Sequence, residues 1–293
     1  MELTPRKTIK NLLKRYKVHP LKRLGQIFLI DKGVIRKIIE AADLELEDVI
    51  LEIGPGLGTI TQEMAKKVKK IIGIEKDLKM TEILKETLKD CKNVEIVLGD
   101  ILKIENWKLK IKNYKVVANL PFYLTAPVIR QFLESIEPRP QQMVLVVQKE
   151  AAQRICAKPP EMSILAVSVQ FYAKPEIVIF VSKKSFWPQP KVDSAILRIN
   201  PLMTTDKKLI NTDLFFKVVR AGFSHPRKQL INNLSKELKL NREEVKDWLL
   251  KNNIQPEQRA ETLTVENWIS LTRIAMKGEE EIYLFDYPNR NEG

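Results

Sequence analysis

The chain of 293 residues has few cysteines and histidines. It contains two cysteines, Cys91 and Cys156, and two histidines, His19 and His225, all far apart in the sequence. Residues this isolated supply neither a disulfide framework nor the ligand spacing of a metal site. We therefore expect no bound metal and treat both cysteines as ordinary residues.

Long apolar runs are also lacking. No run approaches the roughly 18 residues that cross a bilayer, and the first residues contain no apolar segment typical of an export signal. We therefore expect neither export nor membrane insertion. The expected location is the cytoplasm. The hydrophobic content of 44% is that of a globular protein, and the length suits one large domain with a small one.

Positive charge is abundant, with a net charge of +13. Such a field attracts nucleic acid, and a lysine-rich solvated surface is the alternative. Residues 1–25 hold eight Lys/Arg residues and the single acid Glu2, which leaves +7 in this segment. Its basic residues are Arg6, Lys7, Lys10, Lys14, Arg15, Lys17, Lys22 and Arg23. We predict a basic amino-terminal arm over 1–25 that supplies affinity for RNA phosphates and takes no part in chemistry.

The pattern of apolar residues indicates an α/β protein with a seven-stranded, Rossmann-like sheet. Short β-branched runs, separated by segments that suit helices, predict parallel strands at 49–53, 71–74, 94–98, 115–118 and 143–147. The runs 177–181 and 195–199 have prolines between them and predict an antiparallel pair at the sheet edge. Helical spacing after about residue 211 predicts a small all-α domain. The expected boundaries are 26–205 for the sheet domain, 206–278 for the helical domain and 279–293 for a loosely held tail.

A glycine turn and two acids mark a nucleoside site at the ends of the first three strands. Gly54-Pro55-Gly56-Leu57-Gly58 allows close approach of a ligand, but it lacks the dinucleotide spacing, and Pro55 removes a phosphate donor. Glu75 ends the second strand, where an acid can accept both ribose hydroxyls. Asp100 follows the third and can accept from an adenine amine. Each acid alone fits a solvated loop, but together they favour a binding crevice.

Asn119-Leu120-Pro121-Phe122 follows the fourth strand. The side-chain carbonyl of Asn119 and the backbone carbonyl of Pro121 match the two hydrogens of an exocyclic amine, and Phe122 offers a face for a flipped base. The alternative is a proline turn with Phe122 in the core. These groups together can hold an adenine by its exocyclic amine.

These motifs, together with three further segments, form an ordered set that covers nearly the whole chain. The set is Gly25-Gln26-Ile27-Phe28-Leu29, Glu52-Ile53-Gly54-Pro55-Gly56, Glu75, Asp100, Asn119-Leu120-Pro121-Phe122, Phe186-Trp187-Pro188-Gln189-Pro190-Lys191-Val192-Asp193-Ser194-Ala195 and Arg227-Lys228-Gln229-Leu230-Ile231-Asn232-Asn233-Leu234. It resembles the KsgA family of ribosomal RNA small-subunit adenine N6-dimethyltransferases. Erm-type large-subunit rRNA methyltransferases share much of the pattern and are the closest alternative; Ser194-Ala195 and the 227–234 segment favour KsgA.

The resemblance implies a class I methyltransferase fold and transfer of methyl groups from S-adenosylmethionine. The acceptor would be N6 of two adjacent adenosines near the 3′ end of 16S rRNA, two methyl groups on each, with a role in small-subunit ribosome biogenesis. The implied partner is small-subunit rRNA in an immature 30S particle, and we expect a monomer. A methyltransferase-like ribosome-assembly or nucleic-acid-binding factor without activity is the second alternative.

The resemblance also implies residue roles. The cofactor-binding set is Gln26, Ile27, Leu29, Gly54, Gly56, Glu75, Asp100 and Asn119. The catalytic set is Asn119, Leu120, Pro121, Phe122 and Phe186, with the two phenylalanines stacking on opposite faces of the adenine. For Phe186 the alternative is burial against Pro188 and Pro190. RNA contacts are expected from Arg6, Lys7, Lys10, Lys14, Arg15, Lys22, Arg23, Arg220, Arg227 and Lys228.

Two positions depart from the family pattern. Ile27 stands where an asparagine is usual, and Phe122 stands where a tyrosine is frequent. We expect the Ile27 backbone alone to contact the cofactor, so that Ile27→Asn would tighten cofactor binding. If Ile27 instead belongs to an apolar cluster with Phe28 and Leu29, the same change would lower both affinity and stability.

Overall fold

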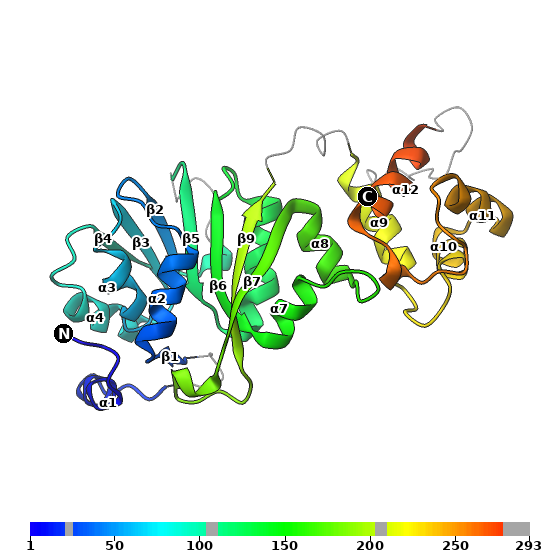
Figure 1. Cartoon of the computed structure of the whole chain (residues 1–293). Helices are drawn as coiled ribbons and strands as arrows, with labels where there is room; N and C mark the ends of the chain where they lie inside the picture. Colours follow the sequence, from blue (N-terminus) through cyan, green and yellow to red (C-terminus); the bar gives the residue numbers. More distant parts are fainter. Residues whose placement is uncertain (21–25, 104–110, 203–209, 278–293) are drawn as a thin grey trace, which may run out of the picture. The chain divides into compact units, whose positions relative to one another are not determined.

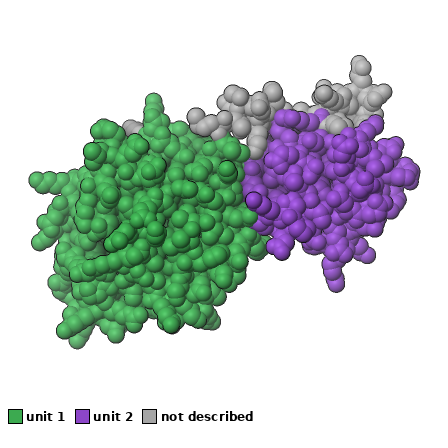
Figure 2. Space-filling view, in the orientation of Figure 1, with its two compact units in different colours: residues 1–156, 172–202 green, residues 157–171, 203–293 purple. Residues whose placement is uncertain are grey.

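The computed structural model describes residues 1–20, 26–103, 111–202 and 210–277. The chain divides into two compact units, shown in green and purple in Figure 2. Unit 1 comprises residues 1–156 and 172–202, and unit 2 comprises residues 157–171 and 203–293. The division between residues 202 and 203 lies close to the boundary expected at 205. Residues 157–171, which were expected in the sheet domain, group with the helical unit.

Unit 1 is built on a seven-stranded sheet with the order β4-β3-β2-β5-β6-β9-β7. The strands are β2 (Val49–Ile53), β3 (Lys70–Glu75), β4 (Val94–Leu98), β5 (Tyr114–Asn119), β6 (Gln142–Gln148), β7 (Ala173–Val181) and β9 (Ser194–Pro201). The first five are parallel, and β9 pairs antiparallel with both β6 and β7. The predicted seven-stranded α/β fold and its antiparallel edge pair are confirmed.

Helices of unit 1 cover both faces of the sheet, with α2 in front of it in Figure 1. They are α2 (Lys32–Ala41), α3 (Thr59–Met64), α4 (Leu78–Thr87), α6 (Thr125–Arg130) and α7 (Lys149–Ile155). Side chains of α2 and α3 form one core cluster with strand residues such as Ile50, Val117 and Val144. Strands β2 and β5 lie side by side. From β2 the chain continues to β3 and β4 on one side, and from β5 it continues to β6 on the other, so the strand order reverses between β2 and β5. Open α/β sheets bind ligands at such a switch point.

A second, two-stranded sheet was not predicted. Strand β1 (Phe28–Leu29) pairs antiparallel with β8 (Phe186–Trp187), so that Phe28 lies opposite Trp187 and Leu29 opposite Phe186. The backbone N–H of Ile30 also donates to the carbonyl of Ser185 at 2.9 Å. This pairing joins two motifs that are far apart in the sequence and fixes the chain just before α2.

The segment expected as a basic arm contains a packed helix, α1 (Arg6–Arg15). Its buried side chains, Ile9, Leu12 and Leu13, form a cluster with Leu57 of the glycine turn and Met80 of α4. The opposite face stays exposed and carries its basic residues Arg6, Lys7, Lys10, Lys14 and Arg15. The amphipathic spacing of α1 therefore gives it a structural role in unit 1 in addition to its charge.

The described elements of unit 2 are mainly helices, and Trp268 is buried among them. The helices are α8 (Ile164–Tyr172), α9 (Thr212–Gly222), α10 (Leu230–Leu238), α11 (Arg242–Lys251) and α12 (Val265–Lys277). Trp268 is fully buried against Gly222, where any β-carbon would overlap its ring. Asn233 fixes the α9–α10 connection by donating to the carbonyls of Gly222 at 2.7 Å and His225 at 3.0 Å. The aromatic ring of Phe171 stacks on Phe215 at 4.1 Å, which explains why 157–171 groups with this unit.

Candidate active site

A cavity of about 370 Å³ lies at the carboxyl ends of β2, β3 and β5. All eight residues of the expected cofactor-binding set line it: Gln26, Ile27, Leu29, Gly54, Gly56, Glu75, Asp100 and Asn119. The volume falls in the range of small-molecule and cofactor sites. The fold thus brings together, at the switch point of the sheet, residues that are spread over nearly a hundred positions of the chain.

The glycine turn forms one wall of the cavity. Gly54, Gly56 and Gly58 have φ values of +67°, +59° and +85°, which side chains with a β-carbon rarely adopt. The turn is tied to its neighbours because Gly54 N–H donates to Ile74 O at 2.9 Å and Gly58 N–H to Pro55 O at 2.8 Å. At Gly54 a β-carbon would meet nothing within 4 Å, so the space beside this residue is open to a ligand.

Glu75 lies at the end of β3 with its carboxylate held by the backbone. Oε2 accepts from Gly56 N–H at 3.1 Å and Oε1 from Asp77 N–H at 2.9 Å. Burial raises the pKa of this carboxyl, and the backbone donors oppose the rise. Because each oxygen keeps a second lone pair, the group is oriented and still able to accept two hydroxyls of a ribose.

Asp100 lies at the end of β4 and already has two partners. Its Oδ2 is 2.8 Å from Lys76 Nζ, and its Oδ1 accepts from Leu102 N–H at 3.1 Å. The hydrogen bond from Lys76 is the main reason that the pKa of Asp100 is lowered. The acid is therefore ionised and can accept from an adenine amine, alongside or in place of the exposed Lys76.

Asn119, the last residue of β5, is held in one orientation by the strand that precedes α2. Its Nδ2 donates to the backbone carbonyl of Ile27 at 3.0 Å. This bond leaves the side-chain Oδ1 as the acceptor that Asn119, a residue of the cavity lining, can offer. The carbonyl of Pro121 accepts from Leu124 N–H at 2.9 Å and retains one lone pair. Two acceptors for the hydrogens of an amine are thus placed within one turn of chain.

Three residues of the catalytic set, Leu120, Phe122 and Phe186, are not among the described residues that line the cavity. Leu120 is buried, with 3% of its surface exposed, and Phe122 is half-buried. Phe186 is 2% exposed and belongs to the core cluster of Leu29 and Val34. Its placement matches the alternative interpretation, a buried hairpin aromatic, because pairing of β8 with β1 turns its ring into the core. The structure does not bring Phe186 to the cavity.

Two polar or aromatic residues that line the cavity, Tyr123 and Glu52, were given no role from the sequence. Tyr123 follows Phe122 and is 55% exposed at the cavity mouth, so it is the aromatic of this turn that a ligand can reach. Glu52, in the strand before the glycine turn, is a buried carboxyl. The signal for Glu52 was its charge inside an otherwise apolar strand, and the signal for Tyr123 was its place beside the tetrapeptide.

Ile27 lines the cavity and also packs against the core cluster around Leu29 and Val34. Its backbone carbonyl orients Asn119, whereas its side chain lies among apolar neighbours. Gln26 is fixed separately, with Nε2 donating to Asp77 Oδ2 at 2.8 Å. The packing favours the second of the two outcomes considered for an asparagine at position 27.

We therefore expect Ile27→Asn to lower both stability and cofactor affinity, contrary to the expectation from sequence. The amide would lose apolar contacts and place a polar group against the cluster, at a cost of about 1–3 kcal/mol. Thermal melting and calorimetric titration with the cofactor measure the two effects, and Ile27→Val, which keeps an apolar side chain, is the matched control. Tighter binding by Ile27→Asn at an unchanged melting temperature would contradict this expectation.

The basic residues expected to bind RNA occur in both units. In unit 1 they are the exposed residues of α1, and Arg15 contacts Glu86 in an ion pair. In unit 2 they are Arg220 at the end of α9 and Arg227 and Lys228 in an exposed connection before α10. Lys22 and Arg23, like the tail 279–293, lie outside the described residues.

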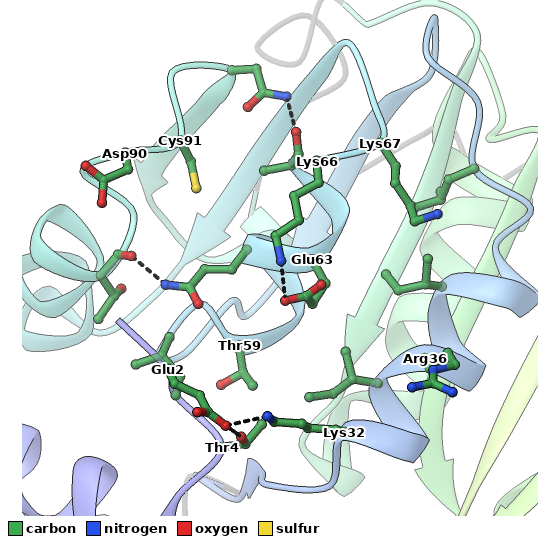
Figure 3. Close-up of a pocket in the computed structure, with 18 of the residues that line it drawn as sticks. Glu2, Thr4, Lys32, Arg36, Thr59, Glu63, Lys66, Lys67, Asp90 and Cys91 are labelled. Carbon is green, nitrogen blue, oxygen red and sulfur yellow. Dashed lines mark hydrogen bonds and ion pairs between the residues drawn. The ribbon is translucent and has the colours of Figure 1, made fainter.

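A second, larger cavity of about 1400 Å³ lies between the amino-terminal segment, α2 and α3 (Figure 3). Its charged side chains are of both signs, and several are paired with each other: Glu2 Oε1 is 2.6 Å from Lys32 Nζ, and Glu63 Oε1 is 2.7 Å from Lys66 Nζ. This mixture of paired charges gives the cavity no preference for a positively or a negatively charged ligand. Thr59 lines both cavities, so the first turn of α3 separates this groove from the candidate active site.

Within the described ranges, no helix is long and apolar enough to cross a membrane. The same part of the chain contains no cluster of three or more His, Cys, Asp or Glu side chains able to hold a metal.

Comparisons with known proteins agree with this geometry. The model of the family described as ribosomal RNA adenine dimethylase matches residues 19–277. The chain is 41% identical over 264 residues to the ribosomal RNA small subunit methyltransferase A of Dehalococcoides mccartyi, covering 89% of this chain and 90% of the relative. It is 39% identical over 279 residues to the protein of that name from Clostridioides difficile, covering 93% and 96%.

Two solved structures are similar over most of the chain. A dimethyladenosine transferase from Plasmodium falciparum has a TM-score of 0.72 and 28% identity, covering 85% of this chain and 98% of that structure. The 23S rRNA methyltransferase ErmE has a TM-score of 0.68 and 26% identity, covering 84% and 98%.

Proposed function

Because the chain belongs to the family of ribosomal RNA adenine dimethylases, we propose that it dimethylates N6 of adenosines in small-subunit rRNA with S-adenosylmethionine as methyl donor. The finer statement is that the substrates are two adjacent adenosines near the 3′ end of 16S rRNA in an immature 30S particle. The curated relatives at about 40% identity carry the name of the small-subunit enzyme, which favours this substrate over the large-subunit RNA of the Erm type.

One observation carries the chemistry: Asn119 donates its amide N–H to Ile27, so its carbonyl is the group presented to an amine. An exocyclic amine is a poor nucleophile because its lone pair is conjugated with the ring. If Asn119 Oδ1 and the Pro121 carbonyl accept its hydrogens, the nitrogen can rotate and direct the lone pair out of the ring plane. The cofactor supplies the methyl group, and the proton leaves the nitrogen for solvent after transfer.

The cavity offers the groups that this cofactor requires. Glu75 is oriented by two backbone N–H groups for a ribose, and Asp100 is ionised for an adenine amine. The open space at Gly54 leaves room for the chain of the methionine part. Tyr123, exposed at the mouth, is the reachable aromatic on which a base can stack.

Methylation of undermethylated 30S particles compared with 50S precursors, followed by mapping of the modified base, tests this function. We expect methyl transfer to 30S particles and a dimethylated adenine pair. Modification of 50S precursors would indicate the Erm-type activity instead. Cofactor binding with no transfer to either particle would indicate an assembly factor without activity. Light scattering in the same buffer checks the expected monomer.

RNA affinity is proposed to come from the exposed face of α1 and from the α9–α10 connection of unit 2. Lys7, Lys10 and Lys14 are three or four residues apart, so they share one exposed face of α1. Replacing all three by glutamine is expected to weaken RNA binding and to reduce the steepness of log affinity against log salt by about two units. The reason is that a phosphate no longer neutralised by a lysine keeps its counterions when the protein binds.

The matched control for this triple variant is glutamine at Lys37, Lys66 and Lys67, which removes the same charge from the exposed surface of α2 and of the segment after α3. Filter binding at several salt concentrations measures both slopes. Equal slopes for the two variants would mean that α1 contributes only general positive charge.

A further inference from the structure

Glu52 is a buried carboxyl whose charge has no part in the function proposed so far. It lies in β2, it is 2% exposed, and it lines the cavity of the candidate active site. Its Oε2 has no hydrogen-bond partner within the described residues. Buried polar atoms in folded proteins are nearly always paired, so an unpaired carboxyl oxygen in a cofactor-sized cavity indicates a partner that is a ligand.

Within the described residues, Glu75 is the charged group that acts on Glu52, and Thr61 is its hydroxyl neighbour. Helix α3 presents Thr61, strand β3 presents Glu75 and strand β5 ends at Asn119, whereas α2 contributes buried apolar side chains. Among these groups only Glu75 is ionisable. Burial, and then repulsion by Glu75, raises the pKa of Glu52 to about 8, so the carboxyl is mostly protonated at neutral pH in the free protein.

We infer that Glu52 determines specificity between the methyl donor and its product, by becoming negatively charged only when the positively charged sulfonium compound occupies the cavity. This inference rests on the proposed use of S-adenosylmethionine. The donor carries one positive charge more than the thioether product, S-adenosylhomocysteine, and apart from the transferred methyl group the two molecules are otherwise the same. A buried carboxyl is sensitive to that single charge because the surrounding protein screens it weakly.

The direction of the pH effect follows from the protonation of the free protein. Below pH 8 the carboxyl must lose a proton to meet the sulfonium, and this loss becomes easier as the pH rises. Affinity for the donor should therefore increase between pH 6.5 and 8.5. The thioether product offers no extra charge, so its binding does not change the protonation of Glu52, and affinity for the product should stay level. Because the product is not attracted by a charged Glu52, its release after methyl transfer is favoured over release of the donor.

Calorimetric titration at pH 7 in two buffers of different ionisation enthalpy counts the protons released on binding. For S-adenosylmethionine we expect the wild type to release about one proton more than Glu52→Gln, because the amide keeps the shape and cannot ionise. For S-adenosylhomocysteine we expect no difference between the two proteins. At pH 8.5 the variant should bind the donor about tenfold more weakly than the wild type and the product within twofold.

Glu63→Gln is the matched control, because Glu63 lies exposed on α3 and the same carboxyl-to-amide substitution is made outside the candidate active site. It should release as many protons as the wild type. Sinefungin carries a positively charged amine in place of the sulfonium. Its binding should therefore release about one proton more from the wild type than from Glu52→Gln, as binding of the donor does. Equal proton release by wild type and Glu52→Gln with the donor, or an equal pH dependence for donor and product, would overturn the inference.

Infrared difference spectroscopy of the wild type decides the same question if Glu52→Gln does not fold. Loss of a protonated-carboxyl band on binding of the donor, and not of the product, is the expected result; loss with both ligands or with neither contradicts the inference. If neither ligand binds at any pH, the proposed use of this cofactor fails, which is a separate outcome.

Discussion

Replacing Asn119 with alanine is expected to lower turnover at saturating RNA and cofactor by about two or more orders of magnitude. The amide is fixed by its bond to Ile27, so its carbonyl needs no reorganisation to accept a hydrogen of the amine. Loss of one positioned polar group in an active site has effects of this size. The fold should persist, because the change removes one hydrogen bond at a half-buried strand end, worth about 0.5–1.5 kcal/mol.

Single-turnover assays with preloaded cofactor measure this effect apart from binding. Asn93→Ala is the control, because Asn93 also donates its amide to backbone carbonyls, those of Ala65 and Val68, but lies away from the cavity. We expect that variant to lose stability and keep its turnover. A folded Asn119→Ala protein with turnover near that of the wild type would remove Asn119 from its proposed role.

Leu12→Ala in α1 is expected to destabilise unit 1 by about 2–5 kcal/mol, the usual effect of truncating a buried leucine. Leu12 is 2% exposed in a cluster with Phe28, Leu57 and Met80, three residues that also line the cavity. Cofactor affinity should therefore fall together with the melting temperature. Lys14→Ala, on the exposed face of the same helix, should change stability by no more than about 0.5 kcal/mol.

This pair of variants separates two roles that deletion of residues 1–17 would remove together. Deletion would take away basic residues and core residues at once, so weakened RNA binding after deletion has two causes. Denaturant unfolding and cofactor titration of the point variants distinguish them. If Leu12→Ala kept its stability and its cofactor affinity, the packing of α1 would not support the cavity.

The strands of the sheet and the expected set of eight residues around the candidate active site were predictable because their signals are local. Each parallel strand is a short β-branched run, and the strands 49–53 and 94–98 have the predicted bounds. Acids and glycines at strand ends point to the carboxyl edge of a parallel sheet, so the sequence alone was enough to expect Glu75 and Asp100 beside the glycine turn.

The errors and omissions concern contacts between distant segments. The pairing of β1 with β8 turned Phe186 into the core, and no local pattern in the Phe-Trp-Pro motif specifies its partner strand. Likewise, the charges of residues 1–25 indicated an arm, whereas Ile9, Leu12 and Leu13 found a matching apolar surface on Leu57 and Met80. Charge is visible in a sequence, but the surface that a short amphipathic helix covers is not.

The sequence by itself determined the α/β class, the seven strands, the helical second unit, the family and the expected residues of the candidate active site, because hydrophobic periodicity, glycine turns and ordered motifs can be read along the chain. Only the tertiary structure decided that Asn119 presents its carbonyl, that α1 supports the cavity wall and that Glu52 is buried without a partner for its Oε2 among the described residues. These properties depend on which atoms meet across the fold, and both a hydrogen bond and the pKa of a buried acid are set by such neighbours.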